Sequence, residues 1–130
     1  MDMSTCQIPL ISVVDDDASV RESLSGLIRA VGFRAKTFNS ADEFLASDRC
    51  HRTDCLILDV RLAGANGLDL FQYLTGNDFA IPVIFITAHG DEHSRARALE
   101  NGAVDYLFKP FSEESLLQAI DTALKSGNRY

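Results

Sequence analysis

The segment Cys55-Leu56-Ile57-Leu58-Asp59 places four apolar residues directly before a carboxylate. A short, nearly continuous apolar run is typical of a strand buried on both faces in a parallel sheet, so Asp59 is expected where such a strand reaches the surface. The earlier run 10–14 ends in the same way, in Asp15-Asp16-Asp17. Ligands of open α/β sheets bind outside the carboxyl ends of the strands. The two runs therefore predict an acidic ligand-binding edge.

Strand-like runs alternate with helix-like stretches along the whole chain. The predicted strands are 10–14, 33–37, 55–58, 82–86 and 104–108. The predicted helices are 18–31, closed by Gly32; a helix from Ser40, with Glu43 completing a capping box; 68–76; 91–100, capped by Asp91; and 112–124, capped by Ser112. Such alternation predicts a mostly parallel sheet with helices on both faces.

The predicted fold is α/β, a flavodoxin-like (βα)5 architecture with a doubly wound parallel sheet of five strands. Strand 33–37 alternates and carries two charges, which indicates an edge position. The right-handed crossover rule then favours the strand order 2-1-3-4-5, with the switch point between strands 1 and 3. This order predicts that Asp15, Asp16 and Asp59 lie side by side.

The predicted fourth helix, residues 91–100, has little apolar area. Its apolar residues are Ala96, Ala98 and Leu99, and Arg95 and Arg97 are expected to face water. An element with few apolar contacts opens at low free energy. We therefore expect this helix to be the one that shifts when the protein changes state.

The 130 residues are expected to form a single domain, 1–130, with a core at about 8–125 and a tail or linker stub at 126–130. A composition of 46% hydrophobic and 24% charged residues is typical of a globular protein. No apolar run approaches the roughly 18 residues of a membrane span. The N-terminus has no signal-peptide pattern, so a cytoplasmic location is expected. The net charge of −7 argues against direct binding of nucleic acid, whose phosphates are contacted by Lys and Arg.

The cysteines and histidines do not form a metal-binding pattern. Cys6, Cys50 and Cys55 are odd in number and irregularly spaced, so free thiols are expected rather than a disulfide framework. Cys50-His51 lacks the second Cys/His pair of a zinc site. His89 and His93 stand in a polar stretch and are expected to face solvent.

The acidic edge has the composition of a phosphoryl-transfer site. Two carboxylates about 4 Å apart repel by roughly 4 kcal/mol at an effective dielectric constant near 20, so clustered acids favour a bound cation. Oxygen ligands beside a phosphate favour Mg²⁺, and an Asp can form an acyl phosphate. Thr87 and Lys109 follow the fourth and fifth predicted strands. A hydroxyl and an ammonium at that edge can stabilise the charge on a transferring phosphoryl group.

Four segments carry a family resemblance: Val13-Val14-Asp15-Asp16-Asp17, Leu58-Asp59-Val60-Arg61-Leu62, Ile86-Thr87-Ala88-His89-Gly90-Asp91 and Phe108-Lys109-Pro110-Phe111. In this order and spacing they resemble the CheY-like receiver domain of bacterial two-component response regulators, over about residues 8–125. Segments 15–23 and 87–91 are most similar to the FixJ-type subclass.

The resemblance implies a site. Asp59 would accept a phosphoryl group from a sensor histidine kinase. Asp16, Asp59 and the backbone carbonyl of Arg61 would bind Mg²⁺, with Asp15 acting through water. Thr87 would hydrogen-bond the phosphoryl group, and Lys109 would pair with it through its ammonium. The Lys109–Pro110 peptide bond is usually cis in this family.

The resemblance also implies a switch rather than an enzyme, with slow autodephosphorylation at most. As Thr87 moves toward the phosphoryl group, Tyr106 would turn inward and the fourth helix would move. The face made by helix 4, strand 5 and helix 5 would then change its partners, with phosphorylation-dependent homodimerisation as one outcome. DNA would be bound only through an output domain that this chain does not contain.

One position departs from the family pattern. The subclass usually has proline where this chain has Ala63. Without the proline, the loop that supplies the Arg61 carbonyl is expected to be looser. The metal affinity or the lifetime of the phosphoryl group is then expected to differ from the family norm.

Other interpretations are weaker. One alternative is that Asp15 to Asp17 simply cap the first helix. A single cap explains Asp17 but not the whole cluster. A haloacid-dehalogenase-type phosphohydrolase would need Thr or Val where Ser19 stands, and a later acidic pair. A receiver that no longer takes phosphate is disfavoured by Asp59, Thr87 and Lys109. The sequence leaves open whether the chain is a free-standing regulator or the receiver of a transcription factor.

Overall fold

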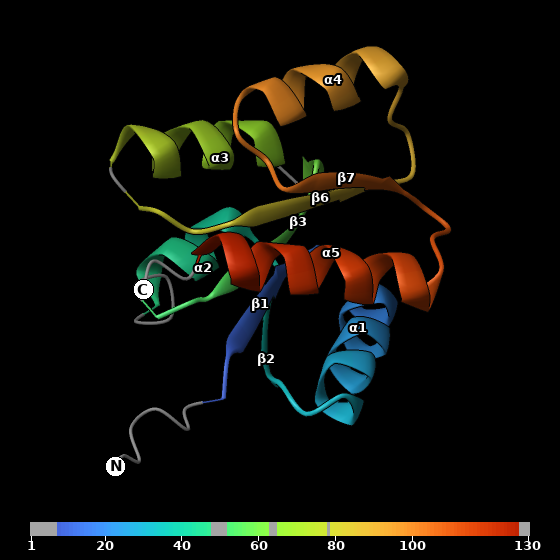
Figure 1. Cartoon of the computed structure of the whole chain (residues 1–130). Helices are drawn as coiled ribbons and strands as arrows, with labels where there is room; N and C mark the ends of the chain where they lie inside the picture. The colour runs from blue at the N-terminus through green and yellow to red at the C-terminus, as the bar shows by residue number, and fades with distance from the viewer. Residues whose placement is uncertain (1–7, 48–51, 63–64, 78, 128–130) are drawn as a thin grey trace.

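The central sheet follows the predicted order. The computed structural model describes residues 8–47, 52–62, 65–77 and 79–127. Its parallel sheet contains β1 (Leu10–Val14), β2 (Arg34–Phe38), β3 (Cys55–Asp59), β6 (Val83–Thr87) and β7 (Asp105–Phe108). The order is β2-β1-β3-β6-β7, with every neighbouring pair parallel (Figure 1). The predicted flavodoxin-like sheet, its order and the edge position of the second strand are therefore confirmed.

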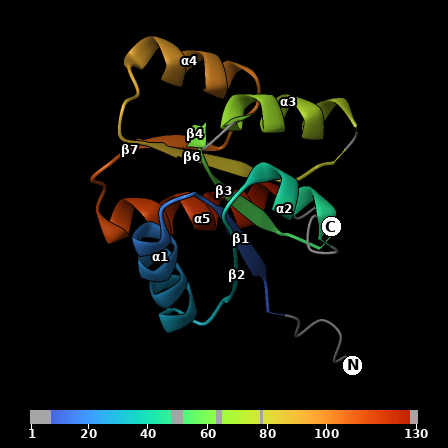
Figure 2. The ribbon, with the colours of Figure 1, turned by 180° about the vertical axis from the view of Figure 1, so that it is seen from behind.

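The helices cover both faces of this sheet. They are α1 (Ala18–Ala30), α2 (Ala41–Ala46), α3 (Gly67–Gly76), α4 (Glu92–Glu100) and α5 (Glu113–Gly127). Helices α1 and α5 lie on one face, and α2, α3 and α4 lie on the other (Figures 1 and 2). Helix α5 continues through residues 126–127, which were predicted to belong to a tail or linker stub. Ser and Gly have weak helix propensity, but this preference is too small to end the helix at residue 125. In the described part of the chain, no helix combines the length and apolar character needed to cross a bilayer.

The predicted caps start the helices. Each predicted cap accepts a backbone N–H at the start of its helix: Asp17, Ser40, Asp91 and Ser112. Asn66, which was not predicted, caps α3 in the same way. At α2 the Glu43 N–H donates to Ser40 Oγ at 3.0 Å. The reciprocal bond differs from a capping box, because Glu43 Oε1 accepts the N–H of Asn39 (2.7 Å), the residue before the cap. Gly32 closes α1 at a φ of 100°, as its left-handed cap requires.

The core consists of two layers, one on each face. Ile57 of β3 packs with the α1 and α5 side, whereas Leu56 and Leu58 pack with the α2, α3 and α4 side. This division follows from the alternation of side chains along a strand. Cys55 is buried in the α1 and α5 layer as a free thiol, and burial, with the nearby charge of Asp54, raises its pKa to about 12. The predictions for Cys6 and for Cys50-His51 lie outside the described residues.

A short antiparallel pair follows β3 and was not predicted. Strands β4 (Arg61–Leu62) and β5 (Ala65–Asn66) are two residues each, too short to leave a periodic pattern. Next in sequence, the Gly67 N–H donates to the Val60 carbonyl at 2.7 Å. A Cβ on Gly67 would collide with the backbone oxygen of Asp59, so glycine lets α3 start against the end of β3. Ala63, where the family pattern has proline, lies outside the described residues.

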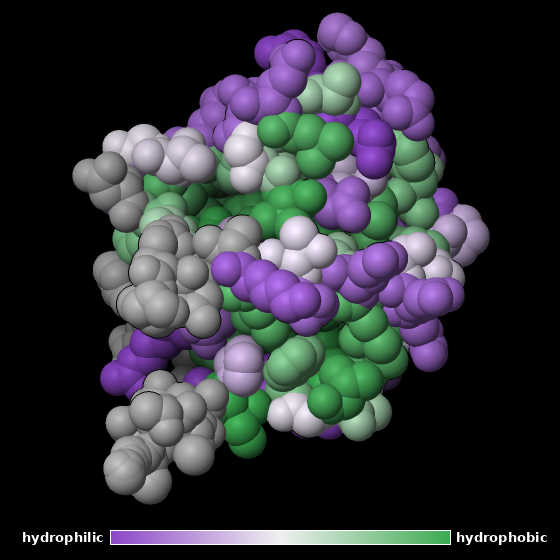
Figure 3. All heavy atoms as spheres, in the orientation of Figure 1, coloured by the Kyte–Doolittle hydropathy of each residue, from purple (hydrophilic) through white to green (hydrophobic). Residues whose placement is uncertain are grey.

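Helix α4 is weakly anchored, as predicted. Its one buried residue is Ala98, and the surface above it is mostly hydrophilic (Figure 3). The expectation that Arg95 faces water was wrong in part. The Arg95 side chain is 40% exposed and its guanidinium lies 4.0 Å from the Asp105 carboxylate of β7. The stem of an arginine can cover apolar surface while its head stays polar, which the pattern of charges does not reveal.

Candidate functional site

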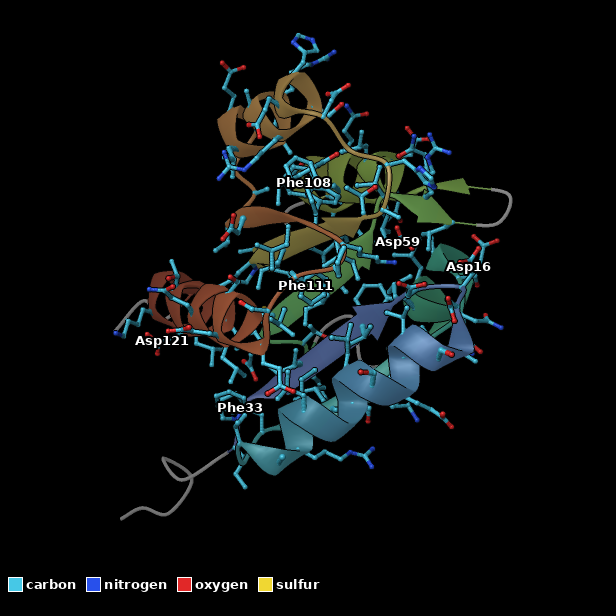
Figure 4. All side chains as sticks on the ribbon, turned by 90° about the vertical axis from the view of Figure 1, so that its right-hand side faces the viewer. Asp16, Phe33, Asp59, Phe108, Phe111 and Asp121 are labelled. Atoms are coloured by element: carbon cyan, nitrogen blue, oxygen red, sulfur yellow. The ribbon has the colours of Figure 1, made fainter. Side chains whose placement is uncertain are left out.

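Asp15, Asp16 and Asp59 meet at the carboxyl ends of β1 and β3. One carboxylate oxygen from each lies within 4.8 Å of the others. The pairing of Val14 with Leu58 in the sheet brings the residues that follow this pair, Asp15 and Asp59, side by side. Asp15 is 0% and Asp59 6% exposed, while Asp16 is exposed. In Figure 4, Asp16 and Asp59 lie at the same end of the sheet. The sequence-predicted acidic edge is thus present.

Lys109 connects the two buried acids. Its Nζ lies 3.1 Å from Asp15 Oδ2 and 3.3 Å from Asp59 Oδ2. Burial alone would lower the pKa of the Lys109 ammonium, but the hydrogen bonds and charges of the two aspartates raise it above its ordinary value of 10.5. Lys109 is therefore a cation at neutral pH. The following Lys109–Pro110 peptide bond is cis, as the family resemblance implies.

Asp59 is strained electrostatically as an anion. Burial and the charge of Asp15 raise its pKa above 3.8, although the Arg61 N–H (3.1 Å from Oδ1) and Lys109 act in the opposite direction. A carboxylate held in this way gains from additional positive charge. The negative charge of the site is therefore not fully compensated by Lys109. A divalent cation or a reacting phosphorus centre can compensate the rest.

Thr87 ends β6, beside β3 in the sheet, because the register pairs Asp59 with Ile86. It is 1% exposed, and its Oγ1 accepts the His89 N–H at 3.1 Å. A hydroxyl that accepts one hydrogen bond can donate another. The Thr87 carbonyl accepts the Lys109 N–H at 2.7 Å, which ties the ends of β6 and β7 together. His89 and His93 are exposed, in agreement with the sequence prediction.

Tyr106 is 2% exposed and links β7 to α4. Burial raises the pKa of its phenol above 10.0, while the nearby Ser94 side chain of α4 acts in the opposite direction. The ring packs against Phe85 at 5.9 Å and Phe108 at 5.6 Å between centroids. The inward position of Tyr106 therefore depends on an aromatic cluster and on one polar contact with the weakest helix.

Gly90 lies against three side chains, a role that its place in the sequence does not indicate. A Cβ at this position would lie 2.6 Å from Thr87 Cγ2, 2.7 Å from Phe108 Cε1 and 2.9 Å from Tyr106 Cε1. All three distances are shorter than non-bonded carbon atoms tolerate. The three side chains therefore fill the volume that a Cβ at position 90 would need. The only sequence signal is a glycine between Thr87 and the cap of α4, which by itself indicates no more than a turn.

Gly90→Ala is expected to destabilise the protein by about 1–2 kcal/mol, as overpacking of a filled site does, and to expose Tyr106. Urea unfolding gives the first quantity. For the second, 3-fluorotyrosine labelling with ¹⁹F NMR reports the exposure of Tyr106, with half-exposed Tyr73 as internal reference. The control is Gly26→Ala in exposed helix, where a Cβ meets nothing within 4 Å; there a small stabilisation is expected. Unchanged stability and a buried Tyr106 in Gly90→Ala would contradict this packing.

The donor set fits a hard divalent cation. Three carboxylates at one sheet edge supply oxygen ligands, which Mg²⁺ and Ca²⁺ prefer over nitrogen and sulfur. Asp17 does not join the three acids that converge here, because its Oδ1 accepts the Ser19 N–H as the cap of α1. Arg61 directs its backbone N–H to Asp59 Oδ1. The cluster therefore can hold a metal ion next to Asp59.

Comparison with known proteins agrees with this geometry. The sequence model of the response regulator receiver domain matches residues 11–121. Response regulator protein TmoT of Ectopseudomonas mendocina is 47% identical over 119 residues, which cover 92% of this chain and 54% of TmoT. The structure of response regulator StyR superposes with a TM-score of 0.85 at 45% identity, covering 93% of this chain and 61% of StyR.

The crystal structure of FixJ-N superposes with a TM-score of 0.82 at 35% identity, covering 92% of this chain and 95% of that structure. The chain spans about half the length of the curated relatives it matches. The fold, the acidic cluster and these matches lead to one conclusion: the chain belongs to the response regulator receiver domain family.

Proposed function

We propose that Asp59 is the phosphoacceptor of a single receiver domain with its core at residues 8–125. The observation that carries the proposal is the placement of Asp59. It is a nearly buried carboxylate, flanked by Asp15 and Asp16 and paired with Lys109. Receiver domains are phosphoacceptor signalling domains rather than classical enzymes, and response regulators receive the phosphoryl group from histidine kinases.

The chemistry is a transfer between two nucleophiles. An Asp59 carboxylate oxygen attacks phosphorus of the kinase phosphohistidine, an O–P bond forms, and the N–P bond breaks to release the imidazole. Lys109 Nζ, 3.3 Å from Asp59 Oδ2, is placed to neutralise charge on the phosphoryl oxygens. Thr87 ends the adjacent strand β6 and is placed to offer its hydroxyl to the same group.

We propose Mg²⁺ as the metal, with Asp16, Asp59 and the Arg61 carbonyl as ligands and Asp15 acting through water. When bound, Mg²⁺ supplies charge neutralisation at the phosphoryl oxygens. Before any transfer, Asp15 and Asp16 hold negative charge around Asp59. In this arrangement transfer is expected to require the metal, because an anionic donor otherwise approaches three carboxylates.

The phosphorylated state is proposed to act through α4, β7 and α5. Movement of Thr87 toward the phosphoryl group changes the contact that Thr87 makes at Gly90, where Tyr106 and Phe108 also pack. Tyr106 lies next to Ser94 of α4, so this contact connects the site to the weak helix. A groove of about 600 Å³ lies between α4 and α5, lined among others by Arg95, Asp105 and Phe111. Hydrophobic side chains show between the polar surfaces of these elements in Figure 3. A partner protein or a second copy of the chain is proposed to bind there.

A transcriptional output is proposed from the relatives. TdiR of Thauera aromatica is named a transcriptional regulatory protein, and this chain covers half of it. A DNA-binding output domain would occupy the remaining length. The net charge of −7 supports DNA contact through such a domain rather than through this surface.

The test is the intact mass of the protein after incubation with acetyl phosphate and Mg²⁺. Addition of one labile phosphoryl group per chain is expected, and none when EDTA replaces Mg²⁺. If the full chain gains no phosphoryl group at any donor concentration, while a receiver domain treated in parallel does, the proposal is wrong.

A further inference from the structure

Arg21 of α1 contacts the acidic site through the backbone. Its Nη1 donates to the carbonyl oxygen of Asp15 at 2.7 Å. Arg21 is partly buried, and its own N–H is bonded to the Asp17 carbonyl in the first turn of α1. The guanidinium therefore folds back from the helix onto the loop that carries the acids.

This bond completes the hydrogen bonding of Asp15, which is fully buried. The Asp15 N–H donates to the Phe38 carbonyl, Oδ1 accepts the Asp17 N–H, and Oδ2 accepts Lys109 Nζ. The backbone carbonyl oxygen is the fourth polar group of Asp15, and it accepts its hydrogen bond from Arg21. Without this donor, the buried carbonyl is left without a hydrogen bond unless the peptide rotates to find another partner.

The same carbonyl belongs to the peptide unit that joins Asp15 to Asp16. The orientation of that peptide sets the direction in which the Asp16 side chain leaves the backbone. Asp16 is the exposed member of the cluster, yet its carboxylate lies within 4.8 Å of those of Asp15 and Asp59. The backbone of Asp15 and Asp16 therefore takes part in placing the exposed carboxylate of the cluster.

We infer that Arg21 is a positioning residue for the metal site: its bond to the Asp15 carbonyl fixes the peptide that aims Asp16 at Asp59. The inference rests on the proposed divalent-cation site and assigns a residue outside it. Groups that orient metal ligands typically change metal affinity by about 10–100-fold when they are removed.

The charge of Arg21 predicts the opposite result, which makes the inference testable. A guanidinium close to the site repels a divalent cation, so its loss would tighten Mg²⁺ binding if electrostatics dominated. Loss of positioning would weaken binding. The sign of the change in Mg²⁺ affinity therefore separates the two effects.

The experiment is a Mg²⁺ titration of Arg21→Gln followed by ¹⁵N–¹H NMR, without phosphodonor. We expect the Kd for Mg²⁺ to rise by about 10-fold. The matched control is Arg29→Gln: Arg29 also lies on α1 and also donates to a backbone carbonyl six residues away, that of Ala35 at 3.3 Å, but far from the acids. This control removes the same charge and bond type, and its Kd is expected to equal that of the wild type.

Arg21→Lys keeps the charge with a shorter, less directed donor, and it serves as the second variant if Arg21→Gln does not fold. A several-fold rise in its Kd is expected. Unchanged or tighter Mg²⁺ binding in a folded Arg21 variant would overturn the inference, even if its unfolding midpoint fell, because a purely structural role changes stability alone. If the wild type itself bound no Mg²⁺, the proposed metal site would fail, and the inference with it.

Discussion

Replacing Asp59 by asparagine is expected to abolish phosphoryl incorporation and, at neutral pH without Mg²⁺, to raise the free energy of unfolding. The first effect follows from loss of the nucleophile. The second follows from the site itself, since burial and the Asp15 charge raise the pKa of Asp59 and so disfavour its anion. Intact mass after acetyl phosphate treatment and urea unfolding measure the two effects.

The stability difference between Asp59→Asn and the wild type is expected to grow with pH. The folded state binds the Asp59 proton more tightly than the unfolded chain does, so the wild type loses stability relative to Asp59→Asn as the pH rises through the range just above 3.8. The difference is fully developed once Asp59 is ionised in both states. Mg²⁺ is expected to stabilise the wild type and to have less effect on Asp59→Asn. A variant less stable than the wild type throughout this range would contradict the account.

Replacing Lys109 by methionine is expected to lower the free energy of unfolding by about 2–3 kcal/mol without Mg²⁺. Removing one partner of a buried ion pair costs about 3–5 kcal/mol, and the 22% exposure of the Lys109 side chain reduces that figure. Asp15 and Asp59 are then left without their ammonium. Because a bound divalent cation compensates the same charges, the loss is expected to shrink as Mg²⁺ is added.

Lys125→Met is the matched control for this prediction. Its Nζ lies 3.1 Å from Asp121 Oδ2, the same distance as in the Lys109–Asp15 pair, but both side chains are more than half exposed on α5. A change of less than about 0.5 kcal/mol is expected, independent of Mg²⁺. Equal losses for the two lysine variants would mean that the buried acids do not depend on Lys109.

The strand order of the sheet and the positions of the acidic residues could be predicted from the sequence, because both depend on local sequence patterns. Apolar runs ending in Asp15 and Asp59 specify buried strands and their carboxyl ends, and the crossover rule then sets the neighbours. The charged alternation of strand 33–37 was enough to place β2 at the edge. The caps at Asp17, Ser40, Asp91 and Ser112 are equally local, and the structure contains them.

The contacts that the sequence did not reveal are those between elements. Gly90 is important because three side chains from β6 and β7 fill the space beside it, and no periodicity encodes that coincidence. Arg21 looks like an ordinary surface residue of α1, and only the path of the loop shows its bond to Asp15. The Arg95–Asp105 pair likewise depends on how α4 crosses β7.

The most direct test of the phosphoacceptor assignment is reduction of the phosphorylated chain with borohydride, which converts an aspartyl phosphate into homoserine, followed by peptide mass analysis. Homoserine is expected at position 59, and unmodified aspartate at positions 15 and 16. Homoserine at position 15 or 16, or a phosphorylated chain in which residue 59 remains aspartate, would contradict the assignment.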